Sequence, residues 1–285
     1  MTAAGGAPRR AVAPAVGLVV LGVGTAQVGG AFAVELFDEL GAAGATFGRL
    51  FFAALILVAI WRPRLRGRLR GDLRVAVAFG LALGGMNLCI YQAMDRIPLG
   101  VAVTFEFIGP LGVAVAGSRR ALDGLWVVLA AAGIVLLADY SGGSLDPAGV
   151  AFALAAGSLW ALYIVLSQRT GALFGGGSGL AIAMVAGAVL TAPFGIAGAG
   201  AALLRPELLG GILAVAVASS VLPYSLDLEA LRRLPARVFG VLMSLEPAVA
   251  ALAGLVVLDQ GLAVRDWIAI GLVVIASAGA STLER

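Results

Sequence analysis

Ten hydrophobic runs, each close to the length of a membrane-spanning helix, fill most of this chain. A helix needs about 20 apolar residues to cross the hydrocarbon core of a bilayer. Hydrophobic residues make up 61% of the sequence and charged residues 12%, which is roughly half the charged share of a soluble domain. The pattern therefore predicts an all-α integral membrane protein with ten transmembrane helices and short loops. The runs centre on residues 13–34, 43–61, 75–94, 99–117, 121–139, 148–167, 178–199, 208–228, 236–257 and 266–282.

Several kinds of chemistry are missing from the sequence. It has no histidine and a single cysteine, Cys89, which excludes imidazole-based triads, histidine-ligated haem, most zinc sites and an internal disulfide. The glycine-rich stretch at 172–179 lacks the lysine and the preceding strand that a phosphate-binding loop requires. We therefore expect no cofactor and no metal. We also expect no nucleic-acid partner, because the net charge of +3 follows a membrane topology pattern.

The arginines indicate how the chain is oriented in the membrane. The loop at 62–74 has the densest cluster of them, and cytoplasmic loops are enriched in basic residues. If alternate loops are assigned from this one, only Arg96, Arg205 and Arg265 fall outside, and both termini are cytoplasmic. The arginines assigned to the cytoplasmic side are Arg9, Arg10, Arg62, Arg64, Arg66, Arg68, Arg70, Arg74, Arg119, Arg120, Arg169, Arg232, Arg233, Arg237 and Arg285.

An internal repeat relates the two halves of the chain. Residues 93–117 align without gaps on 230–254, at a constant offset of 137 and with 8 of 25 positions identical. Proline is rare in this sequence, yet Pro110 coincides with Pro247 in the alignment. Chance matches between abundant alanines do not explain this coincidence. The two halves therefore descend from one common pattern.

The repeat predicts two five-helix units, over residues 11–140 and 147–283. Because five is an odd number, the two units insert into the membrane in opposite orientations. Inverted repeats of this kind are a recurrent plan of secondary transporters, with the binding site near the midplane between the halves. The first helix is needed to complete the first unit. This favours an uncleaved helix over the alternative that Arg9, Arg10 and the apolar stretch up to residues 31–33 form a signal peptide.

Two glutamates lie inside predicted helices. Glu106 lies in the fourth and Glu246 in the ninth. A charge within the bilayer is costly and usually faces a cavity or a partner. In the repeat alignment Glu246 corresponds to Gly109, three residues from Glu106, so the two carboxyl groups project from similar faces about one helical turn apart. Either can bind a proton or a substrate ammonium group.

A structural role is the alternative for Glu106. Pro110 leaves the carbonyl of Glu106 without its usual helical donor. A protonated glutamic acid side chain can satisfy such a carbonyl. We expect both Pro110 and Pro247 to break their helices.

Arg49 is the remaining charge within a predicted span, some six residues inside the second run. It can bind a substrate carboxylate, pair with an acidic neighbour, or extend to the lipid headgroups. Uncharged polar side chains complete the candidate site. They can face a central cavity and suit a small zwitterion, or they can hydrogen-bond between helices. They are Asn87, Tyr91, Tyr163, Tyr224 and Ser225.

Four segments resemble a known transporter family. They are RIPLGVAVTFEFIGPLGVAV from Arg96, GSRR at 117–120, SLWALYIVLSQR at 158–169, and LPYSLDLEALRRLPARVFGVLMSLEPAVAALAG at 222–254. They are similar to the threonine/homoserine exporters, a group in the EamA-type branch of the drug/metabolite transporter superfamily. The resemblance implies ten helices in the bacterial inner membrane, cytoplasmic termini and proton-driven efflux of amino acids. It transfers no defined set of site residues.

We expect from these observations a multi-pass exporter of small amino acids rather than an enzyme. Its partners would be an amino-acid substrate, protons and the lipid bilayer. Alternatives are efflux of an aromatic amino acid or a cationic compound, and a membrane-embedded enzyme acting on lipid. The enzyme would need clustered acid–base groups or metal ligands near an interface. The scattered acidic residues and the absence of histidine argue against it. Loop composition does not support a sensor or assembly subunit without transport.

Overall fold

The computed structural model describes residues 9–116, 122–138, 144–231, 233–234 and 236–283, and within these ranges the chain is helical with short connections. Arg119, Arg120, Arg232, Arg285 and the predicted unit boundary at 140 lie outside the described residues. The elements are α1 (Arg9–Glu35), α2 (Phe37–Trp61), α3 (Arg70–Met94), α4 (Leu99–Glu106), α5 (Ile108–Ala116), α6 (Leu122–Ala138), α7 (Pro147–Leu173), α8 (Ser178–Ala199), η1 (Gly200–Leu204), α9 (Pro206–Ala216), η2 (Val217–Val221), α10 (Leu222–Leu231), α11 (Ala236–Met243), α12 (Glu246–Val257) and α13 (Val264–Leu283).

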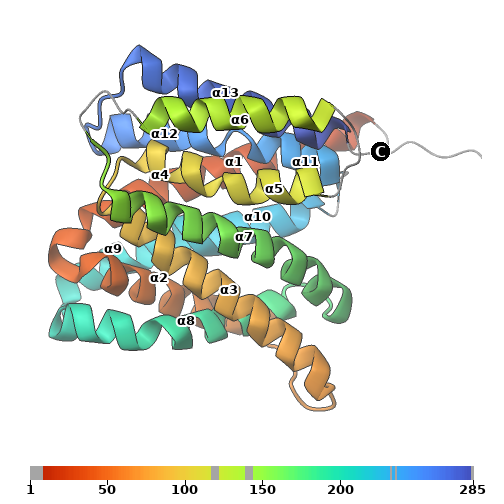
Figure 1. Cartoon of the computed structure of the whole chain (residues 1–285). Helices are drawn as coiled ribbons and strands as arrows, with labels where there is room; N and C mark the ends of the chain where they lie inside the picture. The colour runs from red at the N-terminus through yellow and green to blue at the C-terminus, as the bar shows by residue number, and fades with distance from the viewer. Residues whose placement is uncertain (1–8, 117–121, 139–143, 232, 235, 284–285) are drawn as a thin grey trace, which may run out of the picture.

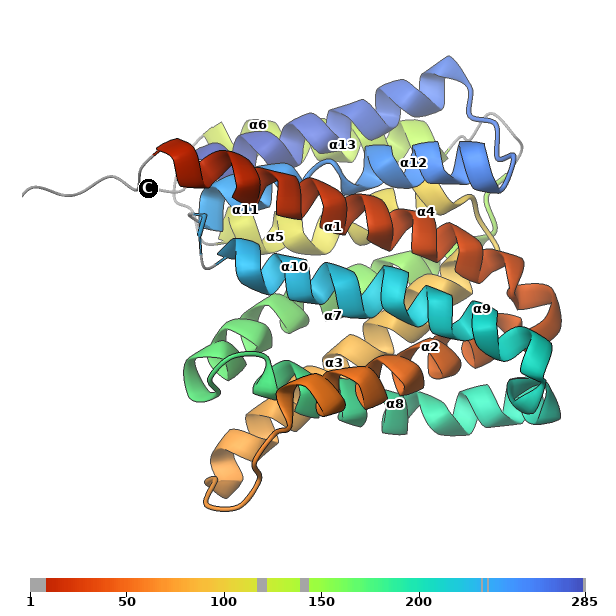
Figure 2. The same cartoon turned by 180° about the vertical axis from the view of Figure 1, so that it is seen from behind.

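The helices run side by side along roughly one direction (Figure 1). The start of α1 and the end of α13 lie at the same side of the molecule as the loop between α2 and α3, as both views show (Figures 1 and 2). This connection, residues 62–69, contains much of the predicted arginine cluster. The described ends of the chain therefore share one side with the most basic loop.

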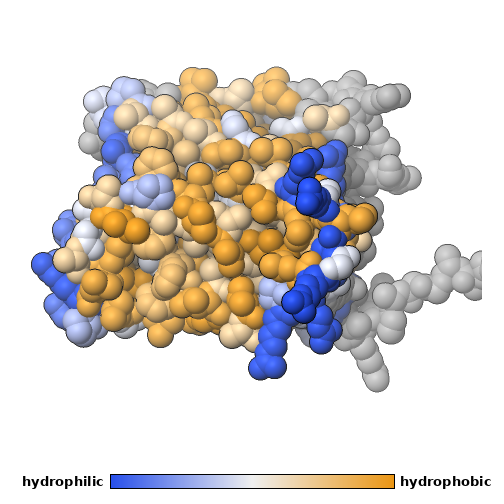
Figure 3. Space-filling model, turned by 90° about the horizontal axis from the view of Figure 1, so that it is seen from below, coloured by the Kyte–Doolittle hydropathy of each residue, from blue (hydrophilic) through white to orange (hydrophobic). Residues whose placement is uncertain are grey.

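The surface has the polarity of a membrane protein. An apolar belt lies between two hydrophilic rims (Figure 3). Val128, Val189 and Val256 are each more than 60% exposed within helices. A soluble monomer rarely exposes a continuous apolar surface of this extent. Among the residues that the structure describes, six helices are long and apolar enough to cross a bilayer, and shorter apolar helices accompany them. The all-helical membrane fold predicted from the sequence is confirmed at this level.

Two of the predicted runs are each divided into two helices. The run at 99–117 consists of α4 and α5, and the run at 236–257 consists of α11 and α12. Pro110 lies in the first turn of α5, and Pro247 in the first turn of α12, where a proline lacking its N–H is tolerated. Both α4 and α11 have eight residues, and their bounds differ by the same 137 positions as the sequence alignment.

The packing is also similar in the two halves. Helix α1 packs against α10, α11 and α12, while α7 packs against α3, α4 and α5. Helices α2 and α8 pack against each other, and so do α6 and α13. This pattern of neighbours is unchanged when the two halves are exchanged.

Gly80 and Gly84, four residues apart on α3, allow close packing against α8. A β-carbon on Gly80 would lie 2.2 Å from the carbonyl oxygen of Ala183, and one on Gly84 would lie 2.7 Å from Cα of Gly187. Only glycine permits α3 to approach α8 so closely. These glycines therefore hold α3, with its polar residues Asn87 and Tyr91, close against α8.

Candidate functional site

A cavity of about 640 Å³ lies between the two halves of the chain. Its volume is typical of a site for a small molecule. The predicted site residues that line it are Arg49, Asn87, Tyr91, Glu106, Tyr163, Tyr224 and Glu246, together with the helix-breaking Pro110. Ser225 and Pro247 are not among the described residues that line it. The fold therefore brings together most of a set that is spread over about 200 positions of sequence.

Arg49 is held in the wall of this cavity. Its side chain projects from α2 and donates hydrogen bonds to Oδ1 of Asn87 and to the backbone oxygen and Oγ of Ser219, the last two at 3.2 and 3.1 Å. The guanidinium also lies over the ring of Tyr91, 4.6 Å from its centroid. Arg49 is only 4% exposed, so it does not extend to the lipid headgroups.

The charge of Arg49 is not matched by a direct ion pair. Within the part of the chain that the structure describes, no carboxylate oxygen lies within 4 Å of its guanidinium, and its Nε has no hydrogen-bond partner. A buried charge is costly unless it is paired and hydrogen-bonded. The guanidinium is thus oriented by neutral groups and retains capacity for an anion.

A proline explains why the backbone of Ser219 is free to bind Arg49. In a regular helix the N–H of residue 223 would donate to the carbonyl of residue 219, but Pro223 has no N–H. The chain here forms the π-helical segment η2, which is a frequent feature of functional sites. The carbonyl of Ser219 accepts from Arg49 instead. The irregular backbone therefore helps to form the site.

The two predicted glutamates lie at helix ends that face the cavity. Glu106 is the last residue of α4 and is 7% exposed, whereas Glu246 is the first residue of α12 and is 8% exposed. Neither has a hydrogen bond or ion pair with another described residue. The structural alternative for Glu106, in which its side chain satisfies its own helix, is therefore not seen. Both carboxyl groups are available to a ligand.

Two glycines, Gly157 of α7 and Gly109 of α5, allow α7 to fit closely against the break between α4 and α5. A β-carbon on Gly157 would lie 2.5 Å from the carbonyl oxygen of Glu106, and one on Gly109 would lie 1.9 Å from the carbonyl oxygen of Gly157. Real β-carbons do not come so close to a backbone oxygen. The absence of side chains at these two positions allows α7 to support the break and fix the depth of Glu106.

A third carboxyl group, Asp227 of α10, lines the same cavity and was missed by the sequence analysis. Its Oδ1 is buried without a hydrogen-bond partner among the described residues. The available signal was helical spacing, because Asp227 follows Tyr224 by three residues and therefore lies on the same face. Gln27 of α1 also lines the cavity and was not predicted.

Aromatic side chains form another part of the wall. The rings of Tyr163 and Phe79 are 5.0 Å apart between centroids, and those of Tyr163 and Tyr224 are 6.3 Å apart. Phe107, in the break after α4, meets Trp160 of α7 edge to face at 5.3 Å. These distances are those of stabilising aromatic pairs. They give the cavity an apolar wall beside its charged groups.

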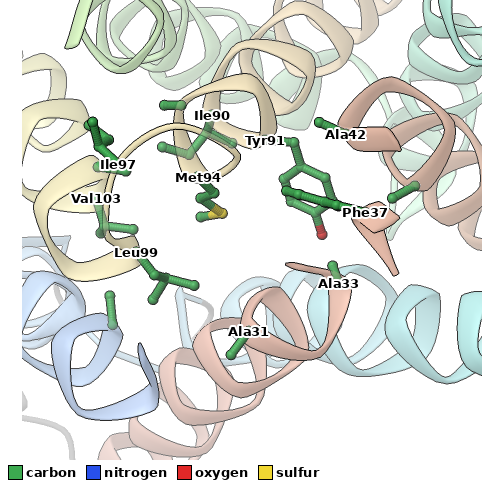
Figure 4. Close-up of a cluster of buried hydrophobic side chains, with 14 of the residues drawn as sticks. Ala31, Ala33, Phe37, Ala42, Ile90, Tyr91, Met94, Ile97, Leu99 and Val103 are labelled. Carbon is green, nitrogen blue, oxygen red and sulfur yellow. The ribbon is translucent and has the colours of Figure 1, made fainter. Parts of the chain in front are cut away.

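An apolar cluster lies at one end of the cavity. Tyr91 packs against Phe37 with ring centroids 5.5 Å apart, and Ala33, Met94 and Leu99 belong to the same buried cluster. Figure 4 shows Tyr91 of α3 beside Phe37 at the start of α2 and facing Ala33 of α1. The hydroxyl of Tyr91 is buried without a partner among the described residues. Tyr91 and Met94 of this cluster line the cavity.

The lining continues in the other direction toward the basic loop. Ser167 and Gln168, near the end of α7, belong to it. Arg68 of the basic loop donates to the carbonyl of Leu173, at the end of the same helix, and lies over the ring of Phe174. The cavity thus extends from the apolar cluster toward the side where the described ends of the chain lie.

Known proteins identify the family. The EamA-like transporter family model matches residues 147–282. The threonine/homoserine exporter RhtA of Escherichia coli K12 is 41% identical over 273 residues, which cover 94% of this chain and 91% of that protein. The chain belongs to the EamA-like transporter family. The resemblance seen in the sequence is confirmed, and this EamA-like transporter is a multi-pass membrane protein.

Two further relatives extend the comparison. RhtA of Salmonella typhimurium LT2 matches this EamA-like transporter with the same identity and coverage. A protein known from a crystal structure is only 21% identical, but it aligns with a TM-score of 0.61 over 94% of this chain and 98% of that one. That likeness shows a shared fold across nearly the whole length of both proteins.

Proposed function

We propose that this transporter exports small amino acids of the threonine and homoserine type from the bacterial cytoplasm. The observation that supports this most directly is the charge arrangement of the cavity. Its described lining contains a single basic residue, Arg49, and carboxyl groups that include Glu106. An amino acid is a zwitterion that presents an anionic and a cationic group to such a site. The names of its 41% identical relatives agree with this substrate class.

The carboxylate of the substrate would bind Arg49. Asn87, Ser219 and Tyr91 already hold the guanidinium in place, so little of its side-chain freedom is lost on binding. Arg49 and Glu106 line the same cavity, so one small ligand could contact both groups. The ammonium group would bind Glu106. The aromatic wall would contact the side chain of the substrate.

The architecture proposed for this activity is two inverted five-helix repeats, over residues 11–140 and 147–283, that together provide ten spans. The equal lengths and offset of α4 and α11 support it, as does the exchange of neighbours between the halves. The family match at 147–282 covers the second of these units almost completely. Buried Ala31 and Ala33 support an uncleaved α1, because both belong to the central apolar cluster.

The orientation proposed is that of an inner-membrane protein with cytoplasmic termini, and the mechanism is alternating access. The described chain ends and the basic loop lie on one side of the molecule (Figure 1). The lining of the cavity continues toward that side, and the buried apolar cluster lies at its other end. This arrangement corresponds to a carrier that faces the cytoplasm. Reorientation would open the Tyr91–Phe37 end and close the opposite one.

Topology can be tested by labelling. In a Cys89→Ser background, cysteines replacing Asp95 and Arg233 should react with an impermeant maleimide from opposite sides of the membrane. Equal reaction from one side would contradict the inverted repeat.

Proton antiport would supply the driving force. Exchange of one proton for one zwitterion moves one net charge, which at 100 mV is worth about 2.3 kcal/mol. That corresponds to a gradient of roughly 50-fold, since each tenfold costs about 1.4 kcal/mol. Such coupling is sufficient to relieve an excess of a cytoplasmic amino acid.

Flux into proteoliposomes tests the substrate class. The purified protein should exchange labelled threonine for internal threonine or homoserine, and protons should move opposite to net threonine flux. Liposomes without protein, and liposomes with an arginine or lysine gradient, serve as controls. If no amino acid in a panel of all twenty exchanges, the proposed function is wrong.

A bulkier amphipathic amine or aromatic amino acid is the second candidate. The cavity volume of about 640 Å³ and the aromatic pairs at Tyr163 and Trp160 favour it. The same panel decides, because phenylalanine or tryptophan would then exchange faster than threonine. A choline-like cation that exchanges while every amino acid fails would favour a cationic drug.

A further inference from the structure

We propose that Asp227 and Glu246 form a proton-binding pair that is separate from the substrate-binding pair Arg49–Glu106. The inference rests on the proposed amino-acid export and divides the cavity into two sites with different tasks. Asp227 is the residue that this assignment adds. Its role would be to bind the proton that allows the empty carrier to reorient.

The position of Asp227 is defined by its contact with α1. A β-carbon added to Gly22 would lie 3.2 Å from Oδ1 of Asp227, so this oxygen lies against the smooth surface that the glycine provides. The same oxygen is buried and has no hydrogen-bond partner among the described residues. A carboxylate oxygen without a donor is unfavourable in a buried site. A bound proton would remove its charge.

Glu246 lies on the neighbouring helix. Helices α10 and α12 both pack against α1, and Asp227 and Glu246 line the same cavity from them. Both carboxyl groups line one buried cavity, where charges act on each other more strongly than in water. Two ionised carboxylates in a site of low dielectric repel each other, so such a pair favours a state with one shared proton.

The charged and titratable neighbours differ between the two pairs. Arg49 and Glu246 are charged neighbours of Glu106, whereas Glu246 has Asp227 and Glu106 as its charged neighbours and has no basic one among the described residues. Among the described residues, α1 contributes the neutral Gln27 to this part of the lining and α13 contributes Ser277. On α7 and α10 the phenols of Tyr163 and Tyr224 face the pair. Phenols are neutral over the physiological range.

Polar groups on other helices show independently that the cavity is built for a ligand. Nε of Arg49 and the hydroxyl of Tyr91 are both without a partner among the described residues, and these side chains are 4% and 2% exposed. Both line the same cavity as the acidic residues. A ligand that satisfies Arg49 and Tyr91 leaves Asp227 and Glu246 to a second species.

The pair would couple transport as follows. With the substrate bound to Arg49 and Glu106, the occupied carrier reorients and releases the substrate outside. In the empty carrier Glu106 has lost the substrate ammonium group and adds an unpaired carboxylate to those of Asp227 and Glu246, so their combined burial opposes the return. An external proton forms an O–H bond with Asp227 or Glu246 and lowers that cost. After the return, the proton dissociates to the cytoplasm.

The test separates exchange from coupling in proteoliposomes. Threonine–threonine exchange at equal pH needs no proton, whereas accumulation of threonine driven by a pH gradient does. An asparagine side chain cannot ionise and mimics the protonated carboxyl group, so Asp227→Asn should retain exchange within about twofold and lose gradient-driven accumulation. Asp227→Glu should retain both. The matched control is Glu39→Gln, an exposed carboxylate paired with Arg205.

A second substitution keeps the inference testable if Asp227→Asn does not fold. Glu246→Gln should show the same separation of exchange from accumulation, whereas Glu106→Gln should lose exchange itself. Gradient-driven accumulation that persists in Asp227→Asn or Glu246→Gln would overturn the assignment. Loss of exchange in a folded Asp227→Asn would also overturn it. If the wild type exchanges threonine but does not accumulate it in response to a pH gradient, the proposed proton-binding pair is wrong while amino-acid export remains supported. If the wild type exchanges no amino acid, both proposals are wrong.

Discussion

Replacing Arg49 by lysine should weaken binding of the substrate carboxylate without removing the positive charge. Arginine presents a planar set of donors, which here contacts Asn87 and Ser219 on one side and Tyr91 over its face. Lysine has a single ammonium group and cannot maintain these contacts and hold a carboxylate in a two-point contact at once. Hydrogen bonds to charged groups are worth about 1.5–3 kcal/mol. The Michaelis constant for threonine should therefore rise roughly 10- to 100-fold.

The assay compares two ligands and two arginines. Apparent affinities of threonine and of an amino alcohol lacking the carboxylate are measured by competition in the exchange assay. In Arg49→Lys only the threonine value should deteriorate. Arg205→Lys is the matched control, because Arg205 is about half exposed in its ion pair with Glu39 and surface pairs contribute little.

The affinity of Arg49→Lys for the amino alcohol shows whether Arg49 binds the substrate carboxylate or supports the shape of the cavity. If both ligands lose affinity to the same extent, Arg49 supports the shape of the cavity and does not bind the carboxylate. An unchanged threonine affinity in a folded variant would also refute the proposed contact. The thermal unfolding midpoint in detergent shows whether the variant is folded.

Three further substitutions test other parts of the structure. Glu106→Gln should abolish threonine exchange while membrane expression remains normal; undiminished exchange would remove this residue from the site. Gly157→Ala should destabilise the protein by about 1–3 kcal/mol, since its β-carbon would lie 2.5 Å from the carbonyl oxygen of Glu106. The control is Gly171→Ala in the same helix, where a β-carbon would meet nothing within 4 Å. This control should leave the thermal unfolding midpoint unchanged or raise it. Pro223→Ala restores an N–H that can donate to the carbonyl of Ser219 in place of Arg49. It should weaken threonine affinity about fivefold, which corresponds to one hydrogen bond, with no loss of thermal stability. The control is Pro193→Ala, at a proline inside α8 that does not line the cavity, and it should leave threonine affinity unchanged.

The prediction of helices succeeded because burial in a bilayer leaves a strong signal in composition. The helix breaks were only partly foreseen. Pro110 and Pro247 mark them, but the equal length of α4 and α11 depends on how the two segments pack against α7 and α1. The π-helical segment was not predicted. Pro223 was its signal, yet the use of the freed carbonyl depends on Arg49, which lies 170 residues away.

The candidate site shows the same distinction between local and tertiary information. Arg49, Glu106 and Glu246 were identified because a charge inside an apolar run is conspicuous. Asp227 lies near the end of its run, beside further charged residues, and resembles a helix boundary in the sequence. Ser225 follows Tyr224 by one residue, which turns it about 100° around the helix and away from the lining. Which side of α10 faces inward is fixed only by its contact with α1.

The two half-helices α4 and α11 have the same length and offset, but their chemistry differs. Glu106 corresponds to Met243, and Glu246 to Gly109, so neither carboxylate has an acidic counterpart in the other half. In the proposed alternating access, the two nearly equivalent scaffolds would adopt each other's shape at comparable free energy, and the carrier would be reversible. Because the charges are placed unequally, a substrate would meet Arg49 and Glu106 in the same orientation from either compartment. The proposed ion gradient, and not the framework, would then determine the direction of transport.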